Sequence, residues 1–182
     1  MRVNKFAVML KTELKLSLRG MDMVIFAICM PVAAVILLGI IYGGKPAFDG
    51  AGYTFLEQSF GAVSTIAVCA GGVMGLPLVI SDYRQKKILK RFKTTPSSPV
   101  LLLSVQIAIY MIYSLAALAL VYLVSVLFFG ARLKGDFLPF MGTFFLVMFS
   151  MFSIGIMVGG VSPNVKTSGI LASLLYFPML IF

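Results

Sequence analysis

The 182-residue sequence has no histidine, no tryptophan, only two cysteines and only six acidic residues. Cys29 and Cys69 lie far apart in apolar runs, so the sequence indicates neither a disulfide framework nor a Cys/His metal site or nucleophile. The acids lie in polar segments or at the ends of apolar runs, whereas ion-coupled transporters usually hold an ionisable residue within the membrane. We therefore expect no catalytic residue, metal or cofactor in this chain.

Apolar residues dominate what is present. The chain is 60% hydrophobic and 12% charged, with a mean hydropathy of +1.06, which indicates an integral membrane protein. A net charge of +9 is compatible with a nucleic-acid partner, but the cations lie in short polar gaps between the apolar runs. A membrane surface explains that placement better, so we expect the lipid bilayer and no nucleic acid as a partner.

The apolar runs predict an all-α polytopic membrane protein. About 20 apolar residues suffice to cross a hydrocarbon core of ~30 Å. The predicted transmembrane helices cover residues 23–43, 60–81, 100–129 and 138–160, and a partial fifth covers residues 168–182. Pro31 predicts a kink in the first of them. Because the fifth run is too short to span, we expect either a fragment of a longer reading frame or a naturally truncated protein.

Residues 1–20 predict an amphipathic helix at the membrane interface. Apolar residues recur at every fourth position, and cations recur at the same interval on another face: Phe6, Leu10 and Leu14, and Lys11, Lys15 and Arg19. This pattern is typical of a helix lying in the interface plane. A signal peptide fits less well, because Glu13 interrupts the segment and no small-residue cleavage site follows it.

The distribution of basic residues predicts a cytoplasmic amino terminus. Of the 15 Lys and Arg residues, only Lys45, Arg132 and Lys134 fall on the opposite side of the membrane in this topology. Short cytoplasmic segments carry the excess of Lys and Arg in membrane proteins. We therefore expect a multi-pass protein of the cell (inner) membrane.

The longest polar segment, residues 82–99, predicts a cytosolic docking element. Six cations face a single acid, Asp82, in this segment: Arg84, Lys86, Lys87, Lys90, Arg91 and Lys93. In a helical conformation Ile88, Leu89 and Phe92 form an apolar stripe that would bind a partner. Pro96 restricts Thr95 and ends such a helix, while Ser98 and Pro99 predict the start of the next one. The alternative is that the cations only fix topology and bind anionic lipid.

Two glycine pairs predict close helix packing. Gly71 and Gly75, and Gly155 and Gly159, have the GxxxG spacing that lets helix backbones approach each other within a membrane. The same spacing serves internal packing and subunit contacts, so it does not choose between them.

The order of these parts resembles the permease subunit of ABC-2 type exporters. The family's Leu-x-x-Leu-x-x-Thr-Pro segment is similar to residues 89–96, with Leu89, Lys90, Arg91, Phe92, Thr94, Thr95 and Pro96, followed by Leu101–Leu103. A second likeness is residues 162–167, which lead into a run with Pro178. Family members commonly have an acidic residue and a glycine before the docking helix, where this chain has Arg84, Gln85, Lys86 and Lys87.

The resemblance implies that residues 1–182 form a single permease domain whose re-entrant segment and sixth span would follow Phe182. It implies docking to a separate ABC ATPase subunit, which holds ATP and Mg, through a coupling helix: Ile88, Leu89, Lys90, Arg91, Phe92, Thr95 and Pro96. A second permease copy, identical or not, is also implied. The cargo would be a hydrophobic or amphipathic compound, such as a drug, or a polymer or an ion. The alternatives are a non-transporting scaffold or assembly protein and an ion-coupled secondary transporter.

Overall fold

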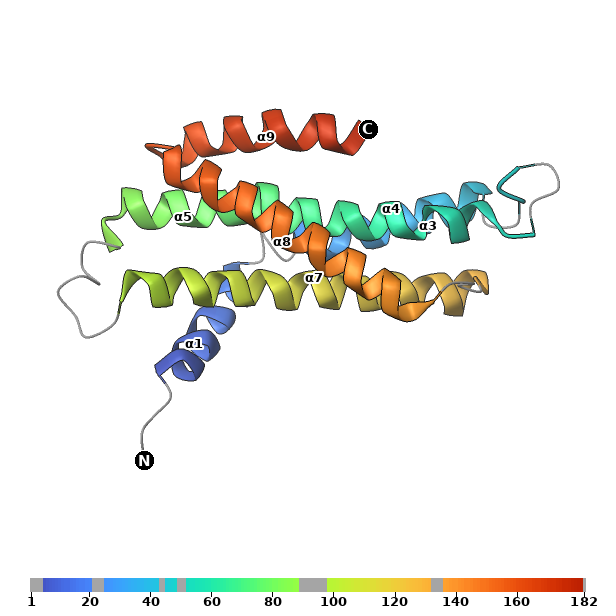
Figure 1. Cartoon of the computed structure of the whole chain (residues 1–182), viewed down its shortest axis with the longest axis horizontal. Helices are drawn as coiled ribbons and strands as arrows, with labels where there is room; N and C mark the ends of the chain where they lie inside the picture. The colour runs from blue at the N-terminus through green and yellow to red at the C-terminus, as the bar shows by residue number, and fades with distance from the viewer. Residues whose placement is uncertain are drawn as a thin grey trace.

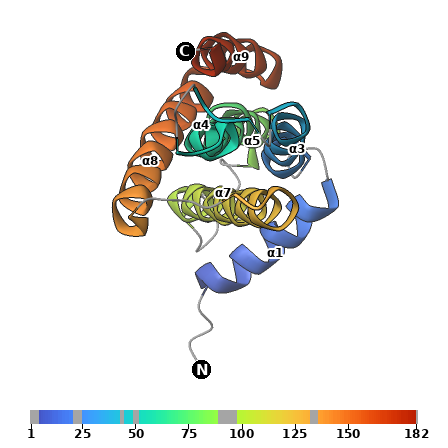
Figure 2. The ribbon, with the colours of Figure 1, turned by 90° about the vertical axis from the view of Figure 1, so that its right-hand side faces the viewer.

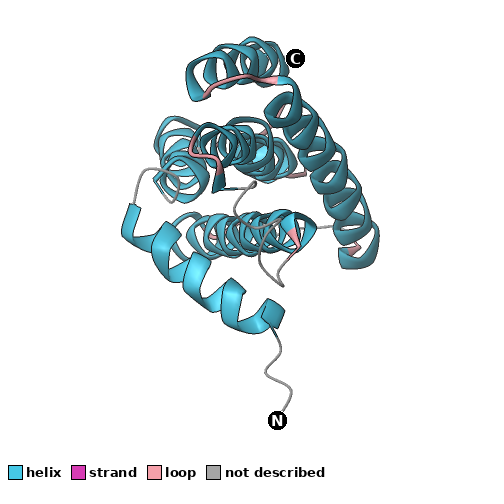
Figure 3. Cartoon of the chain, turned by 90° about the vertical axis from the view of Figure 1, so that its left-hand side faces the viewer, coloured by secondary structure: helices cyan, strands magenta, loops and turns pink. Residues whose placement is uncertain are grey.

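The computed structural model describes residues 5–20, 25–42, 45–48, 52–88, 98–131 and 136–181. The described residues form α-helices, two short π-helices and loops, with no β-strand, so the prediction of an all-α protein is confirmed (Figure 3). The elements in chain order are α1 (Lys5–Gly20), η1 (Ile25–Cys29), α3 (Met30–Tyr42), α4 (Phe55–Cys69), η2 (Ala70–Gly75), α5 (Leu76–Gln85), α7 (Pro99–Phe129), α8 (Phe137–Val161) and α9 (Val165–Ile181).

The composite helix α4–η2–α5 lies at the centre of the bundle. It contacts α3 and α7 on one side, and α8 and α9 on the other (Figures 1 and 2). Helix α1 lies against α7 on the side of the bundle away from α9. The amino-terminal helix α1 and the carboxy-terminal helix α9 thus lie on opposite sides of the bundle.

Three described helices are long and apolar enough to cross a membrane: Phe55–Gln85, Pro99–Phe129 and Phe137–Val161. They contain the predicted spans 60–81, 100–129 and 138–160. The predicted span 23–43 corresponds to a shorter apolar helix, Ala27–Tyr42, and the number of spans stays a prediction. The sequence predicts a kink at Pro31, and in the structure the π-helical segment η1 ends at Cys29, two positions before this proline.

The helix ends have local causes in the sequence. Ser98 Oγ accepts a hydrogen bond from the Val100 amide, and Pro99 occupies the first helical position, so the predicted start of α7 is confirmed. The Thr54 hydroxyl and the Glu57 carboxylate form a reciprocal capping box at the start of α4. Gly130, at φ 62°, ends α7 in a left-handed conformation that glycine adopts without strain.

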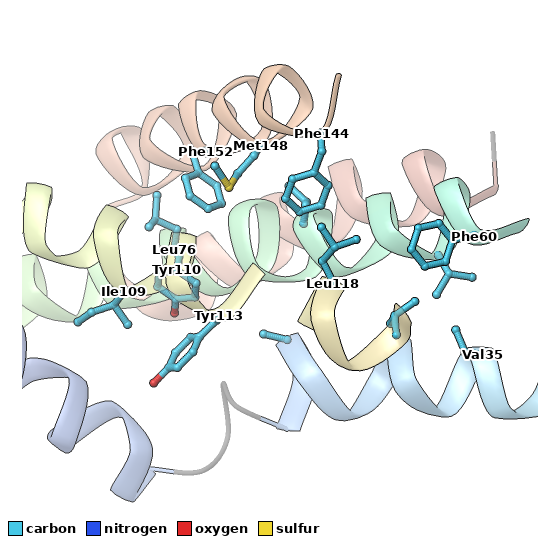
Figure 4. Close-up of a cluster of buried hydrophobic side chains, with 14 of the residues drawn as sticks. Val35, Phe60, Leu76, Ile109, Tyr110, Tyr113, Leu118, Phe144, Met148 and Phe152 are labelled. Carbon is cyan, nitrogen blue, oxygen red and sulfur yellow. The ribbon is translucent and has the colours of Figure 1, made fainter. Parts of the chain in front are cut away.

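The core joins α8 to the rest of the bundle. Phe144, Met148 and Phe152 point from α8 toward the interior of the bundle (Figure 4). There they belong to one buried cluster with Tyr110 and Leu118 of α7. Because interiors are close-packed, movement of one of these helices requires its neighbours to repack.

Candidate functional site at the end of helix α5

The predicted docking residues begin at Ile88, three positions after the end of α5 at Gln85. Ile88 is half-buried and described, whereas Leu89, Lys90, Arg91, Phe92, Thr95 and Pro96 lie outside the described residues. The helix extends through Gln85, past the expected end of the span at residue 81, and an ion pair of 2.8 Å between Lys86 and Asp82 supports its last turn. Lys87, at φ 56°, follows in the left-handed region.

A hydrogen-bonded triad joins the end of α5 to α1 and α7. The Tyr83 hydroxyl donates to Glu13 Oε2 at 2.7 Å. The Gln106 Nε2 amide donates to the same oxygen at 3.1 Å and to the Tyr83 hydroxyl at 2.7 Å. Hydrogen bonds to an ionised carboxylate are stronger than those between neutral groups. We call Glu13, Tyr83 and Gln106 the polar triad.

Helix α1 binds the bundle through the apolar stripe that predicted an interfacial helix. Phe6, Leu10 and Leu14 pack against the main core cluster, together with Met9. The Tyr113 hydroxyl of α7 donates to Ser17 Oγ at 2.9 Å. The apolar face of α1 is therefore partly covered by the bundle, and the polar triad and this hydrogen bond lie on the same face.

The next residue, Arg84, binds the end of α8. Its Nη1 donates to the carbonyl oxygens of Gly159 and Ser162, at 3.4 and 3.2 Å, and also contacts the Gly160 carbonyl oxygen. The last carbonyls of a helix lack intrahelical partners, and a cation there also interacts favourably with the helix dipole. Arg84 thus fixes the carboxyl end of α8 to α5.

The last residue of α5, Gln85, binds the start of α9. Its Oε1 accepts a hydrogen bond from the Val165 amide at 3.3 Å. Tyr83, Arg84 and Gln85, which we call the α5 junction, therefore contact four other helices between them: α1, α7, α8 and α9.

Sequence reasoning did not identify this junction, although it held two signals. Glu13 is an acid at helical spacing from Phe6 and Leu10, on the apolar face of its helix, and Gln106 is the only amide in the apolar run 100–129. A polar group in such a place needs a partner. Arg84 carried no comparable signal, because a cation in a basic segment is expected.

The two glycine pairs lie at different contacts. A Cβ at Gly155 would overlap the carbonyl oxygen of Gly72, and one at Gly159 would lie 2.9 Å from the Cβ of Ile80, so α8 crosses η2 and α5 at very short range. A Cβ at Gly75 would lie 2.6 Å from Cε1 of Tyr110, whereas one at Gly71 would make an ordinary contact of 3.5 Å with the same ring. The glycines thus make room for α8 on one side and for α7 on the other.

A cavity of about 960 Å³ lies at the end of the bundle opposite the α5 junction, between α4, α7 and α8. Aromatic rings form much of its wall, including Phe60, Tyr122, Phe137 and Phe140. Phe60 contacts Tyr122 and Phe140, at ring-centroid distances of 6.4 and 5.6 Å. Such a wall suits an apolar or amphipathic molecule.

The family model described as ABC-2 type transporter matches residues 4–182. No curated protein and no solved structure matches the chain.

Proposed function

The chain belongs to the ABC-2 type transporter family, and from this premise we propose that it is the permease subunit of an exporter driven by a separate ABC ATPase subunit. The family's membrane domain is a transport component and is not itself catalytic. In this proposal ATP and Mg bind the partner, and the chain supplies the path across the membrane. Its amino terminus lies in the cytoplasm, and it works as a pair with a second permease copy.

The observation that carries this proposal is the position of the α5 junction. The junction ends at Gln85, three positions before Ile88, the first residue of the predicted coupling helix. Its side chains bind α1, α7, α8 and α9. When ATP closes the ATPase subunits, movement of the coupling helix displaces the end of α5, and the junction passes that displacement to the surrounding helices.

The cargo that fits best is a hydrophobic or amphipathic compound. The aromatic cavity between α4, α7 and α8 supports this class, because its wall is mostly apolar and adds a few polar side chains, among them Glu57, Gln58 and Asp136. It lies at the bundle end that the cation distribution assigns to the outside, where an exporter releases its cargo.

Co-purification tests the proposal. The tagged full reading frame is isolated from its native host in mild detergent, and the accompanying proteins are identified by mass spectrometry. We expect an ABC ATPase subunit with the wild type and none with Phe92→Glu, which places a charge on the apolar stripe. The control is Phe48→Glu, which places the same charge at an exposed residue at the other end of the bundle. This variant should retain the ATPase.

One result would contradict the proposal, and another would contradict only its docking element. Repeated absence of an ATPase, with the permease intact, would favour the scaffold or the ion-coupled transporter. Normal transport by Phe92→Glu would remove the docking role from residues 88–96 while leaving the transport function standing.

A further inference from the structure

The outward face of α1 carries only positive charge. Glu13 is the only acid of α1, and it is turned inward into the polar triad. The cations of α1 are all exposed on the remaining surface: Lys5, Lys11, Lys15 and Arg19. None of them forms a salt bridge within the described part of the chain. This surface is therefore complementary to an anionic partner.

Exposed apolar side chains accompany these cations. Val8, Leu16 and Leu18 are 53%, 62% and 51% exposed. Since the inward stripe of α1 is already packed on the bundle, these residues cannot be covered by the chain's own core. A helix that combines exposed cations with exposed aliphatic side chains is suited to the headgroup region of a membrane.

The point at which α1 crosses α7 is consistent with a position of α1 in the headgroup region. The contacts of Glu13 and Ser17 with α7 are at Gln106 and Tyr113, well after the start of α7 at Pro99. From Gln106 to Phe129 the helix is about 35 Å long at 1.5 Å per residue, close to the ~30 Å thickness of a hydrocarbon core. A hydrocarbon core that ends near Phe129 on one side would therefore end near Gln106 on the other, which would place α1 at that boundary.

We propose that α1 is an anionic-lipid sensor, whose outward cations bind acidic phospholipid headgroups and whose inward polar triad transmits the position of α1 to the end of α5. The triad suits this role because Tyr83, on α5, is hydrogen-bonded to Glu13 of α1 and to Gln106 of α7. A shift of α1 along the surface thus changes the hydrogen bonds of the residue five positions before Ile88. Only the link to the coupling helix depends on the proposed function.

Lipid selectivity provides the first test. The purified full chain is placed in nanodiscs of phosphatidylcholine with a minority of phosphatidylglycerol, and the lipids it retains are counted by native mass spectrometry. A basic residue near an anionic surface contributes about fivefold in affinity. The double variant Lys11→Gln, Lys15→Gln should therefore lower the affinity for phosphatidylglycerol roughly 25-fold.

The matched control is the double variant Lys45→Gln, Lys134→Gln, which removes the same charge from sequence segments that the cation distribution assigns to the other side of the membrane. This control should bind phosphatidylglycerol at the α1 surface as strongly as the wild type does. Equal retention of phosphatidylglycerol by the wild type and the Lys11, Lys15 variant would overturn the lipid contact. The wild-type preference should also weaken as ionic strength rises, because the cations are exposed to solvent.

Transmission is tested by a spin label at the start of the coupling segment. Ile88→Cys is made in a Cys29→Ser, Cys69→Ala background, and the mobility of the label is compared in nanodiscs with and without phosphatidylglycerol. We expect a lipid-dependent difference that is lost on adding Tyr83→Phe, while retention of phosphatidylglycerol is unchanged.

Each result of the spin-label experiment has a defined meaning. Persistence of the difference in Tyr83→Phe would overturn transmission through the triad. Absence of any difference with Tyr83 present would show that α1 does not act on the end of α5. Because neither measurement contains an ATPase, failure of the proposed ATPase docking would leave both results unaffected.

Discussion

Tyr83 and Glu13, 70 positions apart in the sequence, are joined by a hydrogen bond of 2.7 Å. The same tyrosine hydroxyl accepts from Gln106, so one side chain links three helices. A partly buried carboxylate needs such partners, because leaving a polar group unsatisfied costs about 1–3 kcal/mol. The amino-terminal helix is thus bound to the bundle by a specific contact in addition to its apolar stripe.

Removing the Tyr83 hydroxyl should destabilise the protein by about 1–2 kcal/mol, because Glu13 and Gln106 each lose a partner. Thermal unfolding in detergent measures the loss for Tyr83→Phe. Tyr53→Phe, at an exposed tyrosine in the loop before α4, should leave the unfolding temperature unchanged. A double-mutant cycle with Gln106→Leu should give a coupling energy of about 0.5–3 kcal/mol, and strict additivity would argue against the triad.

Arg84→Gln should loosen the connection between α8 and α9. The variant removes the cation that binds the carbonyl oxygens of Gly159 and Ser162, and an interaction of this kind with a helix end contributes about 0.3–2 kcal/mol. Hydrogen–deuterium exchange of residues 162–168 should therefore become faster. The control is Lys87→Gln, which removes a neighbouring exposed cation, and faster exchange in that variant too would assign the effect to net charge.

Gly155→Ala should be strongly destabilising, since the added methyl group overlaps the backbone of Gly72. Overpacking of this kind costs about 1–3 kcal/mol, and here the obstacle is backbone that cannot rotate away. Gly142→Ala provides the control on the same helix, because nothing lies within 4 Å of the added Cβ. Equal unfolding temperatures for the two variants would show that α8 does not cross η2 this closely.

The sequence predicted the helical class and the three longest apolar helices well, because hydrophobicity alone determines them. It also predicted the start of α7, since Ser98 and Pro99 act within one helical turn. It did not predict the partners of Glu13, Tyr83 and Gln106, because hydrophobic periodicity gives the face of a helix and not which helix covers it. For the same reason the apolar stripe of α1 predicted an amphipathic helix but not that the stripe packs against the bundle.

The contacts at the glycines show the same limit. GxxxG spacing marks a helix surface that allows close approach, but the closest approach joins Gly155 to Gly72, which is not a member of either pair. The crossing angle of α8 and the π-helical segment η2 determine which glycines contact each other. The spacing of glycines along one helix gives information on neither.

Membrane orientation can be measured with single cysteines in a Cys29→Ser, Cys69→Ala background. Lys45→Cys and Lys87→Cys lie at exposed positions at opposite ends of the central helix. The excess of cations around Lys87 predicts that it faces the cytoplasm. A membrane-impermeant maleimide added to intact cells should therefore label Lys45→Cys and should label Lys87→Cys only after permeabilisation. The reverse pattern would place α1 and the coupling segment outside, where no ATPase could reach them, and would contradict the proposed function.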